Sequence, residues 1–401
     1  MSENNEIKEP LNKNNKVPKL RFKGFEEDWI VVNFYNHFTY FSTNSLSWDE
    51  LNYDSGDYLN LHYGIIHSNN SNLILSSLLP FINQDKLPKR FTLINEGDLI
   101  LADTSEDRKD SAKGIEIINK SNTHILSGLH TIHLREKTLC TIPGFKTYYV
   151  ASKSFRNFAR KYCEGIKVFS IKPSLLKYTH FAYPQNKDEQ FMIVDFLNKI
   201  EDKKAILEKK IDILKKYKEG IMIKCYELAK NPPISLSKLV KNNTILLGRG
   251  EIIPKQNGTF PVYSSSAANN GLFCFRNKYS FDEELITWSI DGGGKPFLRN
   301  KHKFSITNVC GYAKILDLNK FSYSWLYINF WNSWRKIKFD YTTKAHPSVI
   351  EKLYKIKPLD IESQLKIEKI LIYINNKIDY LIKELNDVTL TKESLLRSLF
   401  I

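Results

Sequence analysis

Hydrophobic residues recur every three or four positions in two long stretches of this 401-residue chain. Alternating steps of four and three lead from Ile193 to Cys225, and again from Ile367 to Leu399; eight of ten positions in the first stretch and nine of ten in the second are apolar. A repeat of 3.5 residues predicts two helices that pair as a coiled coil, and it does not fit helices that lie on a sheet. The predicted seam contains Ile193, Leu197, Ile200, Leu207, Ile211, Leu214, Ile221, Ile367, Leu371, Ile374, Ile378, Leu381, Leu385, Val388 and Leu395.

The second stretch repeats the first at an offset of 174 residues, without a gap. The match aligns Pro173-Ser174 with Pro347-Ser348 and Pro184 with Pro358, and it holds 12 identities among the 55 pairs from 173 to 227. Each stretch, of about 40 residues, predicts a helix roughly 60 Å long. Each helix must cover its apolar stripe, and the other copy is the nearest partner. The alternative is two unrelated helices that each pack on their own domain.

The segments outside these helices carry short apolar runs, such as GDLILAD (97–103) and EELITWSI (283–290), which predict strands. Pro232-Pro233 cannot continue the first helix. We therefore expect an α+β chain in which two mixed α/β globular domains are separated by two long antiparallel helices, as an internal tandem repeat with pseudo-two-fold symmetry. The expected divisions are a flexible tail at 1–17, globular domains at 18–183 and 232–357, and helices at 184–231 and 358–401.

The net charge of +15 and the pI of about 9.3 favour a polyanionic partner, most simply nucleic acid. A basic proteome would explain part of this charge without such a partner. The five cysteines are widely spaced and show no zinc-binding pattern, so we expect free thiols in a reducing cytoplasm. We expect neither a transmembrane helix nor a signal peptide, because no apolar run has the required length.

Two motifs suggest catalysis at first sight, and neither is complete. NPPI (231–234) lacks the aromatic residue that adenine methyltransferases place fourth to stack on a flipped base, so a helix stop is the better interpretation. DGGGKP (291–296) lacks both the first glycine and the Ser or Thr of a phosphate-binding loop, and it is more typical of a tight turn. The nine histidines show no paired metal spacing. We expect no catalytic residue and no metal site in this chain.

Several segments, taken in order, resemble the DNA-specificity subunit of type I restriction–modification systems. They are PKLRFKGFEEDW (18–29), YLNLHYGIIHS (58–68), GDLILADTSED (97–107), SGLHTI (127–132), FPVYSSSAANNGLF (260–273) and ITWSIDGGG (286–294). The two helices match the spacer regions of that family, so the resemblance covers nearly all of the chain after the tail.

The resemblance implies a subunit without catalytic activity of its own. Its globular domains would be target-recognition domains, each reading one half of an asymmetric bipartite target in double-stranded DNA. The helices would set the spacer between the halves and dock two methyltransferase subunits, which use S-adenosylmethionine. Two restriction subunits, which use ATP and Mg²⁺ for translocation and cleavage, would complete the complex. No cofactor is expected on this chain.

Base reading needs hydrogen-bonding side chains that reach a groove, while Lys and Arg fix the register on phosphates. The candidate DNA-binding residues are His62, Tyr63, His67, Lys86, Lys89, Arg90, Arg108, Lys109, Lys113, Arg249, Ser264, Ser265, Ser266, Asn269, Asn270, Lys295, Arg299, Lys301 and Lys303. Runs of Ser and Asn also make turns, and charge runs are often solvated faces, so a purely structural role stays open for each.

Two other function classes compete with this interpretation. One is a coiled-coil scaffold with two basic globules and no sequence-specific role on DNA. The other is a stand-alone enzyme such as a nuclease, which would need a catalytic constellation that the sequence does not display.

Overall fold

The computed structural model describes residues 16–68, 73–75, 78–118, 123–266, 268–340 and 343–401. The predicted tail therefore lies almost wholly outside the described residues. The chain divides into two compact units, one formed by Met1–Ile206 with Glu384–Ile401 and the other by Leu207–Lys383. Within the described ranges, no helix is both long enough and apolar enough to cross a membrane.

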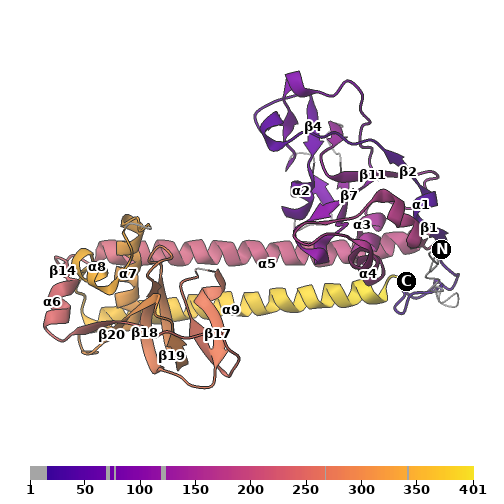
Figure 1. The fold of residues 1–401 in the computed structure, drawn as a ribbon. Helices are drawn as coiled ribbons and strands as arrows, with labels where there is room; N and C mark the ends of the chain where they lie inside the picture. Colours follow the sequence, from indigo (N-terminus) through magenta and orange to yellow (C-terminus); the bar gives the residue numbers. More distant parts are fainter. Residues whose placement is uncertain (1–15, 69–72, 76–77, 119–122, 267, 341–342) are drawn as a thin grey trace, which may run out of the picture. The chain divides into compact units, whose positions relative to one another are not determined.

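The first unit is built on two larger sheets (Figure 1). Its strands are β1 (Ile30–Asn33), β2 (Phe38–Phe41), β3 (Leu51–Asn52), β4 (Tyr58–Leu61), β5 (Leu73–Leu75), β6 (Phe81–Ile82), β7 (Leu99–Ala102), β8 (Thr104–Ser105), β9 (Gly114–Ile118), β10 (His124–Ser127), β11 (Thr131–Glu136), β12 (Phe169–Ser170) and β13 (His180–Tyr183). The five-stranded sheet has the order β2-β11-β7-β9-β5, and the four-stranded sheet has the order β10-β4-β6-β3. All four residues of the central strand β7 are buried, which explains its continuous apolar sequence and confirms the strand predicted there.

Short helices connect these strands. They are α1 (Phe34–His37), α2 (Tyr63–Ser68), α3 (Phe145–Ala151) and α4 (Lys153–Tyr162), with the 3-10 turns η1 (Trp48–Glu50), η3 (Gln84–Lys86), η4 (Arg108–Asp110) and η5 (Pro173–Tyr178). Ser152 caps α4 by accepting a hydrogen bond from the amide of Phe155, which separates α4 from α3.

The second unit contains one six-stranded sheet in the order β15-β20-β18-β19-β16-β17. Its strands are β14 (Ile234–Ser235), β15 (Ile245–Arg249), β16 (Phe260–Tyr263), β17 (Leu272–Arg276), β18 (Phe281–Ser289), β19 (Pro296–Ile306), β20 (Cys310–Ile315) and β21 (Lys355–Ile356). Its shorter helical elements are α6 (Leu236–Lys241), η6 (Ala268–Gly271), α7 (Tyr323–Lys336) and α8 (Pro347–Leu353). The predicted strand at 283–290 is the buried half of β18, where Trp288 packs against Phe330 of α7.

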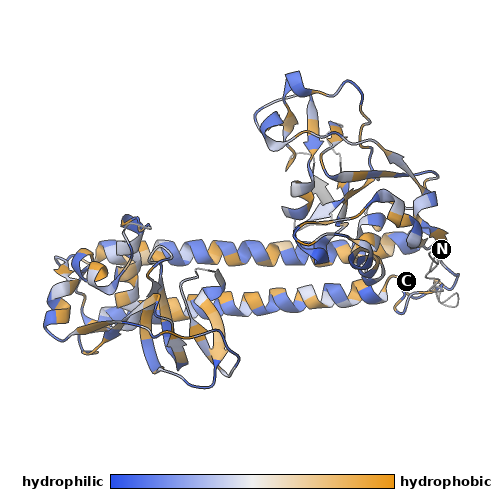
Figure 2. Ribbon diagram, viewed as in Figure 1, coloured by the Kyte–Doolittle hydropathy of each residue, from blue (hydrophilic) through white to orange (hydrophobic). Residues whose placement is uncertain are grey.

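Two long helices account for the heptad pattern: α5 (Lys187–Leu228) has 42 residues and α9 (Ile361–Ser398) has 38. Hydrophobic residues recur along both helices (Figure 2). In the first unit, Leu197 of α5 shares a buried cluster with Leu399, just beyond the end of α9. In the second unit, Met222 near the end of α5 shares a cluster with Leu371 near the start of α9. The start of one helix therefore packs beside the end of the other, so the predicted antiparallel pairing is confirmed.

Polar residues enter the seam in two places, and these places are related by the repeat. In the second unit, Lys218 Nζ donates to Asn375 Oδ1 at 2.7 Å. In the first unit, Lys392 pairs with Glu201. Adding 174 to Lys218 and Glu201 gives Lys392 and Asn375, so one cross-helix pair occurs in both copies. The other predicted seam residues are all buried or half-buried.

A buried glutamine locks each globular region to its own long helix. Gln190 of α5 donates to the carbonyls of Cys140 (3.0 Å) and Pro184 (2.7 Å) and accepts from the amide of Ile142 (2.9 Å), in the loop before α3. Because Gln190 is fully buried, these contacts have no competition from water. We call this arrangement a glutamine clamp.

Gln364, 174 residues later, makes the second glutamine clamp. It donates to the carbonyls of Lys320 (2.8 Å) and Leu359 (2.7 Å) and accepts from the amide of Ser322 (2.7 Å), in the loop before α7. Each globular region also opens and closes with an antiparallel pair of strands, β1 with β13 and β14 with β21. The internal tandem repeat is therefore present in the structure as well as in the sequence.

The segment around residues 18–29 fastens the first unit further. Arg21 makes a bidentate ion pair with Glu189, at 2.7 and 2.8 Å, and Trp29 Nε1 donates to the same carboxylate at 3.2 Å. Glu189 is buried in the first turn of α5, where a negative charge also favours the helix dipole.

Candidate nucleic-acid interface

The histidines of the first unit contact protein groups. His62 is only 2% exposed; its Nδ1 accepts from the amide of Gly64, and its ring packs on Trp48 with 4.4 Å between centroids. Burial, helped by the nearby His130, lowers the pKa of His62 and favours the neutral ring. His67 Nε2 lies 2.7 Å from the carbonyl oxygen of Thr104. His62 thus supports the loop from beneath, and Tyr63 beside it is half-buried.

Lys86, Lys89 and Arg90 are exposed, and two of them line a cleft. The polar cleft, of about 370 Å³, is lined by Ser42, Thr43, Asn44, Ser45, Leu46, Lys86, Pro88, Arg90, Phe91, Thr92, Leu126 and Ser127. Hydroxyl and amide groups of this kind can bond to the edges of bases, and Lys86 and Arg90 add positive charge. Asn44 is held in place by its side-chain hydrogen bond to Asn60 Oδ1 at 2.8 Å.

Sequence reasoning did not select residues 42–45 as candidates. The run STNS follows the aromatic strand β2 and would have been a usable signal, since short polar residues after a strand mark a loop. Its closeness to Lys86 and Arg90 depends on the order of the strands and could not be read from spacing.

The third group in this unit, Arg108, Lys109 and Lys113, lies at and just beyond η4. Arg108 is exposed; its Nε donates to the carbonyl of Arg160 at 3.1 Å, and its guanidinium lies over Phe169. Lys113 is half-buried and donates to the carbonyl of His67 at 3.2 Å. Lys109 and Lys113 line a second cleft together with α4 and α9.

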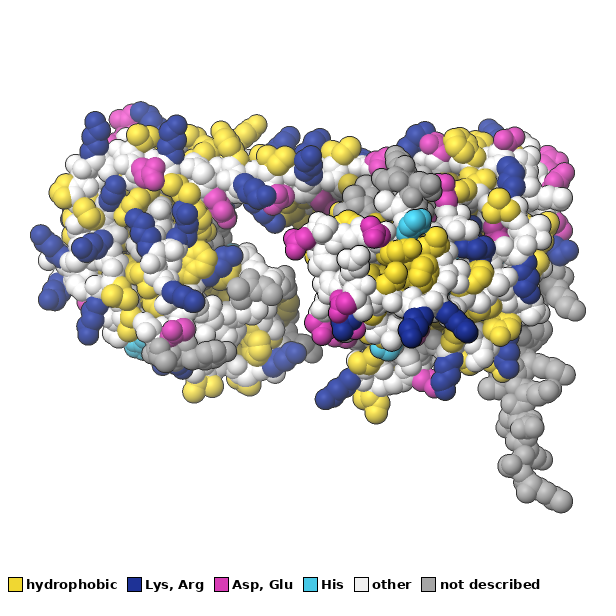
Figure 3. All heavy atoms as spheres, turned by 90° about the horizontal axis from the view of Figure 1, so that it is seen from above, with side chains coloured by type: hydrophobic (Ala, Val, Ile, Leu, Met, Phe, Trp, Pro, Cys, Tyr) yellow, Lys and Arg dark blue, Asp and Glu magenta, His cyan; other side chains and the backbone are white. Residues whose placement is uncertain are grey.

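In the second unit, the basic candidates Arg249, Lys295, Lys301 and Lys303 are all exposed. Lys303 lies over the ring of Tyr279, 4.9 Å from its centroid. The visible faces of both units carry many such basic side chains among hydrophobic ones (Figure 3). These four positions can approach DNA without rearrangement of the fold.

The Ser/Asn run of the second unit forms the predicted turn. Asn269 and Asn270 have φ of 47° and 55°, a left-handed conformation in which Asn is favoured over most other residues. Both are exposed, as is Ser266, whereas Ser264 and Ser265 are half-buried. The turn role and the binding role are compatible, because the turn presents Asn269 and Asn270 to solvent.

Arg299 lies inside the domain, so it is placed for support and not for direct contact with DNA. It is 4% exposed; its guanidinium donates to Thr287 Oγ1 at 3.0 Å and to the carbonyl of Asn270 at 2.9 Å, and it stacks on Tyr263 at 3.7 Å. Burial lowers the pKa of Arg299 to about 10. Its bond to Asn270 holds the exposed turn against the sheet.

The two motifs set aside in the sequence are structural. Pro232-Pro233 follows the end of α5 and precedes β14. Gly293 and Gly294, with φ of 82° and 74°, make the turn between β18 and β19, and Trp334 Nε1 donates to the carbonyl of Gly293 at 2.7 Å. A phosphate-binding loop would need that backbone to be free to face its ligand.

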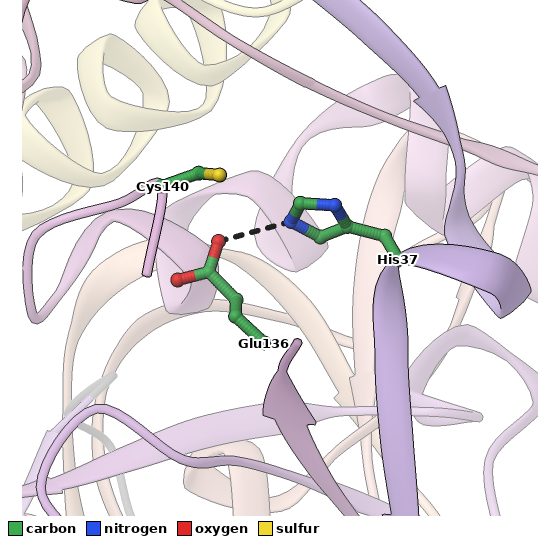
Figure 4. Close-up of side chains that lie close together, drawn as sticks. All are labelled: His37, Glu136 and Cys140. Carbon is green, nitrogen blue, oxygen red and sulfur yellow. Dashed lines mark hydrogen bonds and ion pairs between the residues drawn. The ribbon is translucent and has the colours of Figure 1, made fainter. Parts of the chain in front are cut away.

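His37, Glu136 and Cys140 gather potential metal ligands in the first unit (Figure 4). His37 Nε2 lies 3.0 Å from Glu136 Oε1, while Glu136 Oε2 accepts from Thr141 and lies 3.5 Å from Lys146 Nζ. Burial opposes ionisation of Glu136, but the hydrogen bond from His37 and the Lys146 charge bring its pKa below the usual value. Because Lys146 already supplies the positive charge that a metal would, we assign a hydrogen-bonded network and no metal.

Comparison with known proteins finds relatives of one kind, although no family model matches the chain. A Mycoplasma pneumoniae protein provisionally named as a type I specificity subunit is 44% identical over 71 residues, which are 17% of this chain and 23% of that protein. A second such protein from the same organism is 43% identical over 72 residues, or 20% of its length. The matched stretches thus span only about a quarter of these relatives or less.

Two solved structures share the fold over nearly the whole chain. The type I restriction–modification S subunit from M. genitalium has a TM-score of 0.55 at 17% identity, covering 96% of this chain and 99% of its own. A chain from a study of the assembly of the type I restriction–modification system has a TM-score of 0.55 at 13% identity, covering 93% and 98%. The predicted resemblance is therefore confirmed: in fold over nearly its whole length, and in sequence over about a sixth of it, this chain is similar to the specificity subunits of type I restriction–modification systems.

Proposed function

We propose that this chain is the non-catalytic DNA-specificity subunit of a type I restriction–modification complex. Each globular domain reads one half of an asymmetric bipartite target in double-stranded DNA. The observation that carries this proposal is the pair of glutamine clamps: two domains with different sheets are fixed to two paired helices by the same side chain at an offset of 174 residues. Repeated attachment of unlike domains suits two unlike half-sites.

The DNA-reading role is further supported by charge and by side-chain chemistry. The chain has a net charge of +15, and its exposed candidates in both units combine Lys and Arg with short polar residues. In the first unit these are gathered in the polar cleft, and in the second they surround the turn that bears Asn269 and Asn270. Because the two surfaces differ, the half-sites that they read differ too.

Docking of two methyltransferase subunits is supported by a second apolar stripe on each long helix. Three exposed apolar residues of α5, namely Phe191, Phe196 and Ile206, recur 174 positions later in α9 as the exposed Leu365, Ile370 and Tyr380. At about 100° per residue, each set covers a sector of about 140°, apart from the seam. A helix with two apolar faces requires two partners, and two like patches fit two copies of one protein.

The remaining functions of the complex are assigned to the partners. S-adenosylmethionine, ATP and Mg²⁺ belong to the methyltransferase and restriction subunits, two of each, and this chain binds none of these cofactors. The paired helices set the spacer between the half-sites, and the subunit chooses the target.

Mapping of adenine methylation tests the proposal. In a host that expresses this chain with its methyltransferase, we expect a split motif with two unlike halves and a spacer of fixed length. A continuous or palindromic motif, or methylation that does not depend on this chain, would contradict it. The competing scaffold role predicts that the methyltransferase co-purifies with the chain but that no motif is selected.

A further inference from the structure

A second cleft in the first unit is much more basic than the polar cleft. The basic cleft has a volume of about 450 Å³ and lies between η4, α4 and the last turns of α9. The η4 segment contributes Lys109 and Lys113. Helix α4 adds Lys153, Arg156 and Arg160, whose spacings of three and four residues place them on one face.

Helix α9 completes the cleft with Lys392 and Arg397, so seven lining side chains are basic. The acidic lining residues are Asp110 and Glu393, and seven minus two leaves a charge of +5. Glu201 also offsets Lys392, with which it pairs from outside the lining. Even with that carboxylate counted, the cleft retains a large positive excess.

The ionisation of two lining residues reflects this excess. Burial lowers the pKa of Arg156 to about 10, and the charge of Arg160 lowers it further. Burial also lowers the pKa of Lys113, and the cations Arg156 and Lys392 add to that effect. Like charges held together out of water cost free energy, and a bound anion offsets this cost.

The chemistry of the lining distinguishes the basic cleft from the polar cleft. Among the described residues that line the basic cleft there is no Ser, Thr, Asn, Gln or aromatic side chain. The polar cleft, by contrast, is rich in Ser and Thr and includes Asn44 and Phe91. Lys and Arg alone recognise phosphates without regard to sequence, whereas base edges are read through neutral donors and acceptors as well. Guanidinium groups also suit phosphate because they donate two parallel hydrogen bonds.

We propose that the basic cleft binds phosphates of the DNA backbone next to the half-site read by the first domain. This inference rests on the proposed DNA-reading function and divides that function within one unit. The basic cleft supplies affinity and register, and the polar cleft supplies sequence choice.

The test uses the full chain and duplexes that contain the mapped target or a scrambled target. The double variant Lys153→Gln/Arg160→Gln removes two exposed charges of the basic cleft. The control Lys137→Gln/Lys167→Gln removes two exposed charges of the same unit that do not line it. Removing one bond to a phosphate lowers the slope of log K against log salt by about 0.9, so we expect a decrease of about 2 on both duplexes and an unchanged preference for the target. The control variant is expected to keep the wild-type slope.

Amine labelling gives a readout that is independent of affinity. Duplex DNA is expected to protect Lys109 and Lys153 from an acylating reagent, and to leave Lys167 reactive. Equal protection by tripolyphosphate or by polyglutamate would overturn the proposal in favour of a free polyphosphate or an acidic chain. An unchanged salt slope in the cleft variant would overturn it as well.

The failure of this inference is distinguishable from failure of the proposed function. If the wild-type chain binds both duplexes equally, sequence reading is refuted, while the salt slope still decides the role of the cleft. If the target is preferred and the cleft variant keeps its slope, sequence reading stands and the cleft proposal fails. A chain that binds neither duplex would refute both.

Discussion

Replacing Gln190 by Met should release the first domain from α5 without changing the packing volume. Met keeps the length and unbranched shape of Gln but removes all three hydrogen bonds of the clamp. Lys187 still bonds to the carbonyl of Cys140, so the amide of Ile142 and the carbonyl of Pro184 lose the side-chain partner that the clamp gave them. At about 1–3 kcal/mol for each buried group without a partner, the local cost is about 3 kcal/mol.

Amide hydrogen exchange measures this cost at the site of the change. A loss of about 3 kcal/mol corresponds to opening about 150 times more often, at 1.4 kcal/mol per factor of ten, so the Ile142 amide should exchange faster by about that factor. The matched variant Gln364→Met should accelerate the amide of Ser322 and leave Ile142 unchanged. The exposed Phe191→Leu serves as a control on the same helix. Exchange at Ile142 within a factor of three of wild type would refute the argument that the clamp holds this loop.

Three further changes test the seam, the basic candidates and the buried histidine. Leu207→Asp places a charge at a position that is 3% exposed, so it should cost at least the about 2–5 kcal/mol of a buried Leu→Ala change in thermal melts, whereas Ile206→Asp, at 53% exposed, should melt as wild type does. Arg90→Ala should lower the salt slope of DNA binding by about one at unchanged melting temperature, whereas Arg299→Ala should lower the melting temperature because it removes two buried hydrogen bonds. His62 has a folded pKa below its usual 6.5, so the unfolded chain takes up the proton first; stability is complete above pH 6.5 and should fall on acidification below it, less so in His62→Gln, as denaturant titration at pH 7.5 and 5.5 would measure. Equal pH dependence in the two proteins would count against a buried neutral His62.

Periodic features were predictable because they are local. The seam, the antiparallel helices and the strands at 97–103 and 283–290 follow from spacing and from continuous apolar runs, and the structure contains them. The glutamine clamp was visible only as an identity within the repeat. Its role depends on a loop nearly 50 residues upstream, which no periodicity marks.

The candidate site was less predictable, because exposure is a tertiary property. Arg299 reads as a surface charge in the sequence, but Thr287 and Asn270 become its partners only when β18, β19 and the turn after β16 meet. His62 is likewise covered by Trp48. The two clefts combine segments that are distant in sequence, so their contrasting chemistry could not be read from residue types alone.

The repeated parts of this chain are its junctions, and this explains how unlike domains can share one scaffold. A lysine in an apolar seam is costly unless it finds a partner, and Lys218 and Lys392 find theirs only when α5 and α9 are in one register. A shift by one heptad would leave both ammonium groups among apolar side chains. The clamps then tie each domain to a helix whose register is already fixed. Because neither device uses residues of the larger sheets, a five-stranded and a six-stranded sheet can occupy equivalent places in the repeat, and their surfaces are free to differ without disturbing the helices that carry them.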